Sequence, residues 1–130
     1  MRRLLVTEAD YANLSLLHSR DLRRWLAQAT RVASDAMPAD VVTMNSRVAC
    51  TDLPGGARRL LSVVYPDDAN VDAGRYSVLT EAGLALLGSS PGQLVEWSRP
   101  DGTLHRLSVE ALVYQPEQDL RAKLIFPRAR

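Results

Sequence analysis

The spacing of hydrophobic residues changes near Pro38, and this change most constrains what the chain can fold into. Before it, apolar residues recur every three or four positions, the period of a helix packed on one face: Leu22, Trp25, Leu26, Ala29, Val32, Ala33 and Ala36. After it, short β-branched runs alternate with turn residues, which is typical of strands. Proline cannot continue a helix, so Pro38 marks the boundary. The pattern predicts an α+β protein whose sheet follows a helical N-terminal part.

Two helices are predicted before Pro38. Thr7 is a favourable N-cap for a helix over 8–18, and Ser19 begins a second helix that runs towards the proline. Two such helices joined by a few residues form an antiparallel hairpin, whose arms would be about 17–25 Å long at 1.5 Å per residue. The tip of this hairpin would carry His18, Arg20 and Asp21. Ahead of it, residues 4–6 are either a short strand or a docking segment.

The part after Pro38 is expected to form a sheet with one short helix. Strands are predicted over residues 41–44, 47–52, 58–65, 76–79, 93–98 and 103–115. Thr80 caps a helix over 81–87, which Gly88 terminates. Turns are predicted at residues 53–56 and 100–102, and the acidic stretch 66–74 is predicted to be a surface loop.

Composition permits one domain with a buried core and disfavours a membrane or nucleic-acid binder. The chain has 130 residues, 46% of them hydrophobic, and a net charge of +1. No apolar run approaches the roughly 20 residues of a membrane span, and the apolar run after Arg3 is too short for a signal peptide. Cys50 is the single cysteine and is expected to be an inert buried thiol. We therefore expect a cytoplasmic protein, monomeric by default.

The acidic residues of the middle segment gather in sequence. They are Asp67, Asp68, Asp72 and Glu81. A solvated loop and a contact surface for a basic partner both fit this group.

Four segments, in order, carry a resemblance to a known family: Met37–Val48, Leu61–Pro66, Tyr76–Gly88 and Leu112–Glu117. Together they resemble the Rnk family, the regulators of nucleoside diphosphate kinase, which is related to the GreA/GreB transcript-cleavage factors. The resemblance implies a short helical hairpin at 1–37, an FKBP-like domain with an antiparallel sheet, similar to the GreA/GreB C-terminal domain, at 38–117, and a basic tail at 118–130. The hairpin matches only by architecture, and the tail has no match. Glu81 stands where relatives often have proline, and either residue suits a helix start.

The resemblance also implies RNA polymerase as the partner. Gre factors dock at the rim of the polymerase secondary channel, and their long coiled coil carries two carboxylates that help hold a catalytic magnesium. Here the predicted tip has one acid, Asp21, on short arms. We therefore expect docking at the rim without stimulation of transcript cleavage, competition with Gre factors, and an effect on nucleoside diphosphate kinase levels. Whether the kinase is touched directly stays open.

The residues implied for polymerase contact surround the short helix. They are Ser77, Leu79, Thr80, Glu81, Ala82 and Leu84, with Asp68 nearby. Helix capping by Thr80 and Glu81, and a core position for Leu84, are the alternatives. For the tip residues His18, Arg20 and Asp21 the alternative is a solvated turn.

Two other functions fit parts of the sequence. An FKBP-like fold allows a prolyl isomerase, but such sites are lined by aromatic residues and this chain has one Phe, two Trp and four Tyr. A nucleic-acid-binding module could use Arg23, Arg24, Arg121 and Lys123, which lack neighbouring aromatics for stacking. No phosphate-binding loop or nucleophile elbow is present, and His18 and His105 are far apart. No catalytic residue, metal or cofactor is expected.

Overall fold

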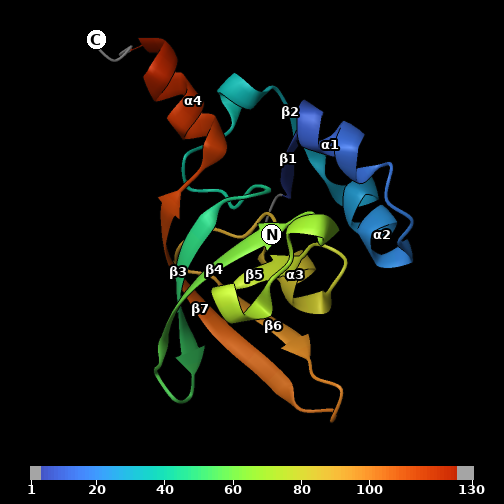
Figure 1. The fold of residues 1–130 in the computed structure, drawn as a ribbon, viewed down its shortest axis with the longest axis vertical. Coiled ribbons are helices and arrows are strands. Elements are labelled where there is room, and N and C mark those ends of the chain that lie inside the picture. Colours follow the sequence, from blue (N-terminus) through green and yellow to red (C-terminus); the bar gives the residue numbers. More distant parts are fainter. Residues whose placement is uncertain (1–3, 126–130) are drawn as a thin grey trace.

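A five-stranded sheet in the order β5-β4-β3-β7-β6 organises the chain from Arg47 onwards (Figure 1). The computed structural model describes residues 4–125, with side chains for residues 4–122. The strands are β3 Arg47–Leu53, β4 Arg58–Val64, β5 Arg75–Ser77, β6 Leu94–Ser98 and β7 Leu104–Tyr114. The sheet is antiparallel as expected except for the β4–β5 pair, which is parallel. An α+β fold with a sheet after Pro38 is therefore confirmed.

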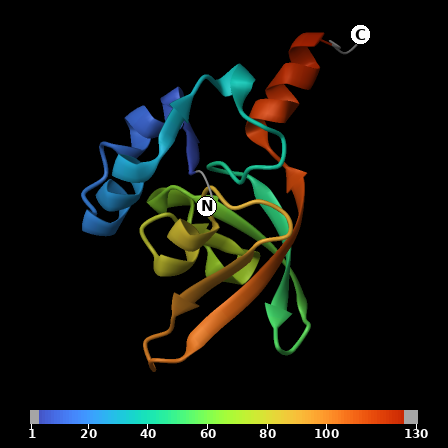
Figure 2. The same cartoon turned by 180° about the vertical axis from the view of Figure 1, so that it is seen from behind.

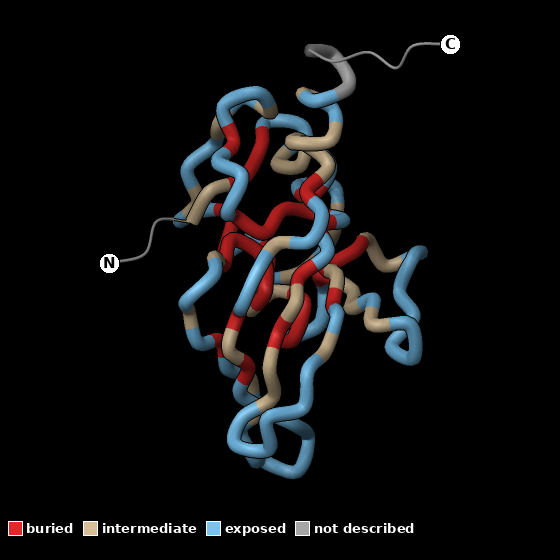
Figure 3. Tube along the Cα trace, turned by 90° about the vertical axis from the view of Figure 1, so that its left-hand side faces the viewer, coloured by how far each residue is buried: buried red, intermediate tan, exposed pale blue. Residues whose placement is uncertain are grey.

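One face of this sheet packs on the hydrophobic core. Val48 and Cys50 on β3 alternate with more exposed neighbours, as do Leu61 and Val63 on β4. This alternation is what a strand with one buried face requires. Helix α3, Glu81–Leu86, contributes the fully buried Leu86 to the same core. Figure 3 shows the buried residues concentrated between the sheet and the N-terminal segment.

The N-terminal part is a helical hairpin shorter than the sequence suggested. Its helices are α1 Glu8–Leu14 and α2 Arg20–Gln28, and Thr7 and Ser19 cap them as predicted. The predicted continuation of the second helix to Ala36 is wrong. Ala29 takes an extended conformation, and the β-branched Thr30 and Val32 then enter a strand, β2 Thr30–Val32, that pairs in parallel with β1 Leu5–Thr7. Of the two possibilities for residues 4–6, a short strand is the one observed.

The segment at residues 41–44 is buried but is not a strand, which corrects the prediction. The amide of Val42 donates to the carbonyl of Ser89 at 2.8 Å, while the amide of Thr43 donates to the hydroxyl of Ser46 at 2.9 Å. Asn45 has φ of 67°, a left-handed conformation that asparagine tolerates. The local bond between Thr43 and Ser46 closes a tight turn, and the bond from Val42 ties the segment to Ser89, so no sheet ladder forms here.

Helix α4, Pro116–Ile125, begins two residues before the predicted tail of residues 118–130. An Arg121 guanidinium donates to the carbonyl of Met37 at 2.5 Å, and the Gln115 amide donates to the carbonyls of Pro38 and Val41. The tail is therefore helical as far as Ile125 and is joined to the segment before the sheet through Arg121; residues 126–130 lie outside the described part. Figures 1 and 2 show α4 and the helical hairpin at the same end of the sheet, away from the turns of the β3–β4 and β6–β7 hairpins.

Within residues 4–125, no helix has the length and apolar character needed to cross a lipid bilayer.

Candidate functional site

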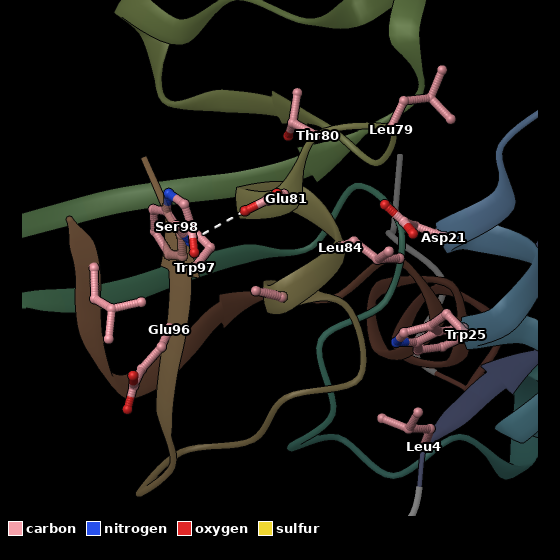
Figure 4. Close-up of a pocket in the computed structure, with 12 residues that line it drawn as sticks. Leu4, Asp21, Trp25, Leu79, Thr80, Glu81, Leu84, Glu96, Trp97 and Ser98 are labelled. Atoms are coloured by element: carbon pink, nitrogen blue, oxygen red, sulfur yellow. Dashed lines mark hydrogen bonds between the residues drawn. The ribbon is translucent and has the colours of Figure 1, made fainter. Parts of the chain in front are cut away.

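The helical hairpin, α3 and β6 meet around a groove with a volume of about 500 Å³ (Figure 4). Its lining residues come from parts of the chain that are far apart in sequence: Leu4, Asp21, Trp25, Leu79, Thr80, Glu81, Leu84, Ala85, Glu96, Trp97, Ser98 and Leu104. We call this surface the acidic groove, because its charged lining residues are the carboxylates Asp21, Glu81 and Glu96.

Two hydrogen bonds and one close contact fix the position of α3 in the groove. The Thr80 hydroxyl accepts from the amide of Gly83 at 3.1 Å, which satisfies a free donor of the helix N-terminus. The Glu81 carboxylate accepts from the amide of Ser98 at 3.1 Å and so joins α3 to β6. A Cβ at Gly83 would lie 2.1 Å from the carbonyl oxygen of Ser77, so only glycine allows α3 to pack this closely.

Trp25 anchors the hairpin side of the groove. Its side chain is 9% exposed. A Cβ at Gly88 would lie 3.0 Å from the Trp25 ring and 3.3 Å from Leu4, so the ring lies closely against this left-handed glycine. Because Trp25 and Asp21 lie one turn apart on α2, burial of the indole places the Asp21 carboxylate beside α3 (Figure 4).

A stacked pair of rings supports the β6 side. Trp97 and His105 lie with ring centroids 4.5 Å apart and an interplanar angle of 10°. His105 Nε2 lies 3.0 Å from the Asp52 carboxylate, which also pairs with Arg59 at 3.5 Å. The aromatic surface at this side of the groove is therefore braced by neighbouring strands. Among the described residues, no group of three His, Cys, Asp or Glu side chains could hold a metal ion.

The groove can bind a partner that combines basic and apolar groups. It has three carboxylates and no Lys or Arg among its lining residues. Leu79 and Leu104 are 44% and 54% exposed, so each offers an apolar contact at the surface. The Glu96 carboxylate pairs with Arg106 at 3.7 Å, but both side chains are largely exposed and such a pair is easily exchanged for another.

The structure brings together five of the residues predicted for partner contact: Asp21, Leu79, Thr80, Glu81 and Leu84. The others do not line the groove. Ala82 is 6% exposed and lies in the core, and Ser77 uses its hydroxyl to accept from the amide of Leu79. His18 and Arg20 are exposed outside the groove, and Asp68 lies in the loop before β5.

Sequence reasoning missed the other lining residues, of which Trp25, Glu96 and Trp97 contribute most to the chemistry. The helical spacing placed Trp25 only on the packed face of the predicted second helix. The predicted strand over residues 93–98 could have indicated that Glu96 and Trp97 lie near α3. Consecutive elements of a chain are usually neighbours in space, and this strand is the next element after α3.

A second acidic cluster joins the hairpin to α4. Burial and, to a smaller extent, the nearby Glu117 carboxylate raise the pKa of Asp10 to about 6, against the opposing effect of hydrogen bonds from Tyr65 and Met44. The Tyr65 hydroxyl donates to Asp10 at 3.3 Å, and the Thr43 hydroxyl donates to Glu117 at 2.6 Å. Burial and the Asp10 carboxylate also raise the pKa of Tyr65.

Cys50 is 1% exposed, which confirms that the thiol is buried. Burial, together with the acidic Glu110 and Asp52, raises the pKa of the Cys50 thiol to about 11. At neutral pH it is therefore protonated and a poor nucleophile.

Comparison with known proteins identifies the relatives of this chain. Residues 37–114 match the family described as "Transcription elongation factor, GreA/GreB, C-term". The regulator of nucleoside diphosphate kinase from Escherichia coli K12 is 37% identical over 114 residues, which span 88% of this chain and 82% of the relative. The transcription elongation factor GreA from Nitratidesulfovibrio vulgaris is 30% identical over 101 residues, which are 78% of this chain and 58% of the relative.

A solved structure supports the same relationship. The chain matches a GreA/GreB transcription elongation factor from Nitrosomonas europaea with a TM-score of 0.73 and 30% identity, covering 88% of this chain and 100% of the other. These relatives are named as regulators or elongation factors and not as enzymes. The chain therefore belongs to the GreA/GreB C-terminal domain family and, within it, to the group of the regulators of nucleoside diphosphate kinase.

Proposed function

We propose that this protein docks on RNA polymerase through the acidic groove, at the rim of the secondary channel, and modulates transcription by competing with Gre factors. The observation that carries the proposal is the convergence in one groove of the hairpin tip residue Asp21 with three residues at the N-terminal end of α3, Leu79, Thr80 and Glu81. The family relationship supplies the class of partner. The charge and exposed leucines of the groove supply the chemistry that a basic and apolar surface of that partner would meet.

The length of the hairpin supports a role without transcript cleavage. Helices α1 and α2 have seven and nine residues, which at 1.5 Å per residue are only about 10–14 Å long. The Asp21 carboxylate faces α3 and is part of the groove instead of projecting from it. A protein of this shape occupies the rim site without delivering carboxylates to the polymerase active centre. An effect on nucleoside diphosphate kinase levels then follows from altered transcription.

The proposal is tested by binding of the purified protein to core RNA polymerase, with GreA added as a competitor. Leu79→Arg places a cation at the exposed edge of the groove and should weaken binding at least about tenfold, because buried anchors dominate interfaces. Leu120→Arg is the matched control: Leu120 is 54% exposed on α4, away from the groove, and its change should leave binding intact. Binding that GreA does not displace, or that both variants weaken equally, would contradict rim docking through the groove.

Glu81 needs a separate pair of variants because it has two roles. Its carboxylate accepts from the Ser98 amide, so Glu81→Arg removes an internal hydrogen bond as well as a negative charge. Glu81→Gln keeps an acceptor oxygen and removes only the charge. A loss of binding with both variants assigns the effect to charge complementarity; a loss with Glu81→Arg alone assigns it to geometry.

Cleavage is tested on the same samples. Stalled elongation complexes should show no additional transcript cleavage with this protein, and cleavage stimulated by GreA should fall as this protein is added. Cleavage above the level of polymerase alone would contradict the non-cleaving role.

A further inference from the structure

The outer face of the sheet, opposite the core, carries a row of in-register polar side chains on four adjacent strands. Ser62 on β4 pairs with Arg75 on β5 and with Arg47 on β3, and Arg47 pairs with Tyr114 on β7. Residues paired in register point to the same face of a sheet. We call these four residues the arginine row.

The spacing of the arginine row suits an anion placed between the two cations. Neighbouring strands lie about 4.8 Å apart, so the Cα atoms of Arg47 and Arg75 are about 10 Å apart with the Ser62 hydroxyl between them. The row surrounds a hollow of about 400 Å³, and none of the seven residues that line it is acidic. A ligand above Ser62 can therefore accept hydrogen bonds from Arg47 on one side, from Arg75 on the other, and from the Ser62 hydroxyl between them.

Among the described side chains, no carboxylate neutralises Arg47 or Arg75, in contrast to Arg59 and Arg106 on the same sheet. Arg59 pairs with Asp52 at 3.5 Å and Arg106 pairs with Glu96 at 3.7 Å. Within residues 4–122, the Arg47 side chain has no ion pair or hydrogen bond, and the Arg75 side chain uses only Nε, which donates to the carbonyl of Asp68 at 3.1 Å. That bond holds the Arg75 guanidinium at the sheet while its two terminal amino groups stay available.

An apolar hollow adjoins the row. Two positions along, the in-register residues are Leu60, Ala49 and Ala111, and the small alanines leave a depression of about 620 Å³. Glu110 is the one acid that lines it, against Arg58 and Arg59. The outer face thus combines two free cations, an exposed tyrosine and a shallow apolar floor. A few convergent polar groups beside an apolar surface are typical of small-molecule sites.

We propose that this face binds an organic phosphate of nucleotide size, with the phosphate at the arginine row and the flat apolar part over Ala49 and Ala111. Phosphate fits better than carboxylate because it has three terminal oxygens that can accept from Arg47, Arg75 and Ser62 together. Guanidinium groups are well suited to such oxygens. The proposal is independent of docking through the acidic groove, because no residue lines both the groove and the hollow at the arginine row.

The test is a titration of the full chain with adenosine diphosphate, followed by amide chemical shifts in NMR spectra. Saturable shifts should centre on residues around 47, 62, 75 and 111. Arg47→Gln and Arg75→Gln should each weaken binding about tenfold, the usual effect of one hydrogen bond between charged groups. Arg23→Gln is the matched control, because it removes the same charge from the exposed surface of α2. Thermal unfolding of each variant checks that the fold is retained.

Further probes separate the two halves of the site. Inorganic pyrophosphate should bind at the same arginines but more weakly than the nucleotide. Ala111→Leu, at an exposed position, should reduce nucleotide binding and leave pyrophosphate binding unchanged.

Three outcomes would overturn the proposal. One is the absence of saturable shifts with both phosphates at millimolar concentration. Another is an equal loss of affinity in Arg23→Gln, which would show unspecific attraction. The third is tighter binding of a single-stranded oligonucleotide through the same row, which would make the ligand a nucleic acid.

Discussion

The acidic groove and the arginine row belong to one sheet domain but are built in different ways. The groove combines residues from Leu4 to Leu104 through tertiary packing of the hairpin and α3. The row depends on strand register alone, since its members are paired neighbours on β5, β4, β3 and β7. The groove should therefore be sensitive to changes in the core, whereas the row should tolerate them and contribute little to stability.

The largest effect is expected from Trp25→Ala. The indole is 9% exposed and lies against Gly88, so its removal leaves a cavity under the hairpin and should cost about 3–5 kcal/mol in the free energy of unfolding. Urea denaturation measures this loss. At urea concentrations where the sheet remains folded, polymerase binding should be weakened while adenosine diphosphate binding persists. A variant that lost both together would show that the two surfaces depend on the same packing.

Gly83→Ala should act on the opposite side of the groove. Its Cβ would meet the Ser77 carbonyl at 2.1 Å and force α3 away from β5, at a cost of about 1–3 kcal/mol. Gly55→Ala is the control, because its Cβ would meet no atom within 4 Å and its φ is not positive. Thermal unfolding of the pair measures the difference; equal midpoints would refute the close packing of α3.

Asp10→Asn should change how stability depends on pH. The pKa of Asp10 is about 6 in the folded protein and 3.8 in the reference state, so between these values the folded state binds more protons. Stability from this group is therefore greatest at low pH and falls as pH rises through about 6, by at most about 3 kcal/mol. The variant should match the wild type near about pH 4 and be more stable by about 1–3 kcal/mol near about pH 7.

Urea denaturation at the two pH values measures this effect, and the difference between the proteins removes the contribution of groups they share. Around Asp10, the groups that face it are Glu117, Tyr65 and Thr7. A constant difference at both pH values would place the Asp10 carboxylate in water instead of at the interface with α4.

The smallest effect on stability is expected in the arginine row. Arg47→Gln and Arg75→Gln should each change the free energy of unfolding by less than about 0.5 kcal/mol, because neither side chain has a carboxylate partner within the described side chains. Denaturation of these variants complements the binding titration. A stability loss above about 1 kcal/mol would give the row a structural role and weaken its contrast with the groove.

The elements that the sequence predicts well are those with local signals. The caps Thr7, Ser19 and Thr80 all lie where their side chains suggested. The second helix was overextended because Ala29, Val32 and Ala33 keep a helical spacing, while pairing of Thr30 with Leu5 across the chain overrides it. Such non-local pairing leaves no mark in a helical period.

The two surfaces show the same limit. Glu81 and Leu79 were expected to contribute to a contact surface because the short helix is visible in the sequence. Trp97 and Glu96 were not, since their approach to α3 depends on how the sheet curls. Arg47 and Arg75 are 28 positions apart in the sequence, and only the register through Ser62 makes them neighbours.

The hydrogen bond from the Ser98 amide to Glu81 also affects how the protein meets copies of itself. Strand β6 is the last strand of the sheet, and an unpaired strand at that position is a template on which another chain can add a strand. The Glu81 carboxylate accepts a hydrogen bond from the Ser98 amide of this edge strand and brings a negative charge to the edge of the sheet. A side chain of the surface proposed for docking therefore also leaves this edge with one donor fewer for pairing with a second copy.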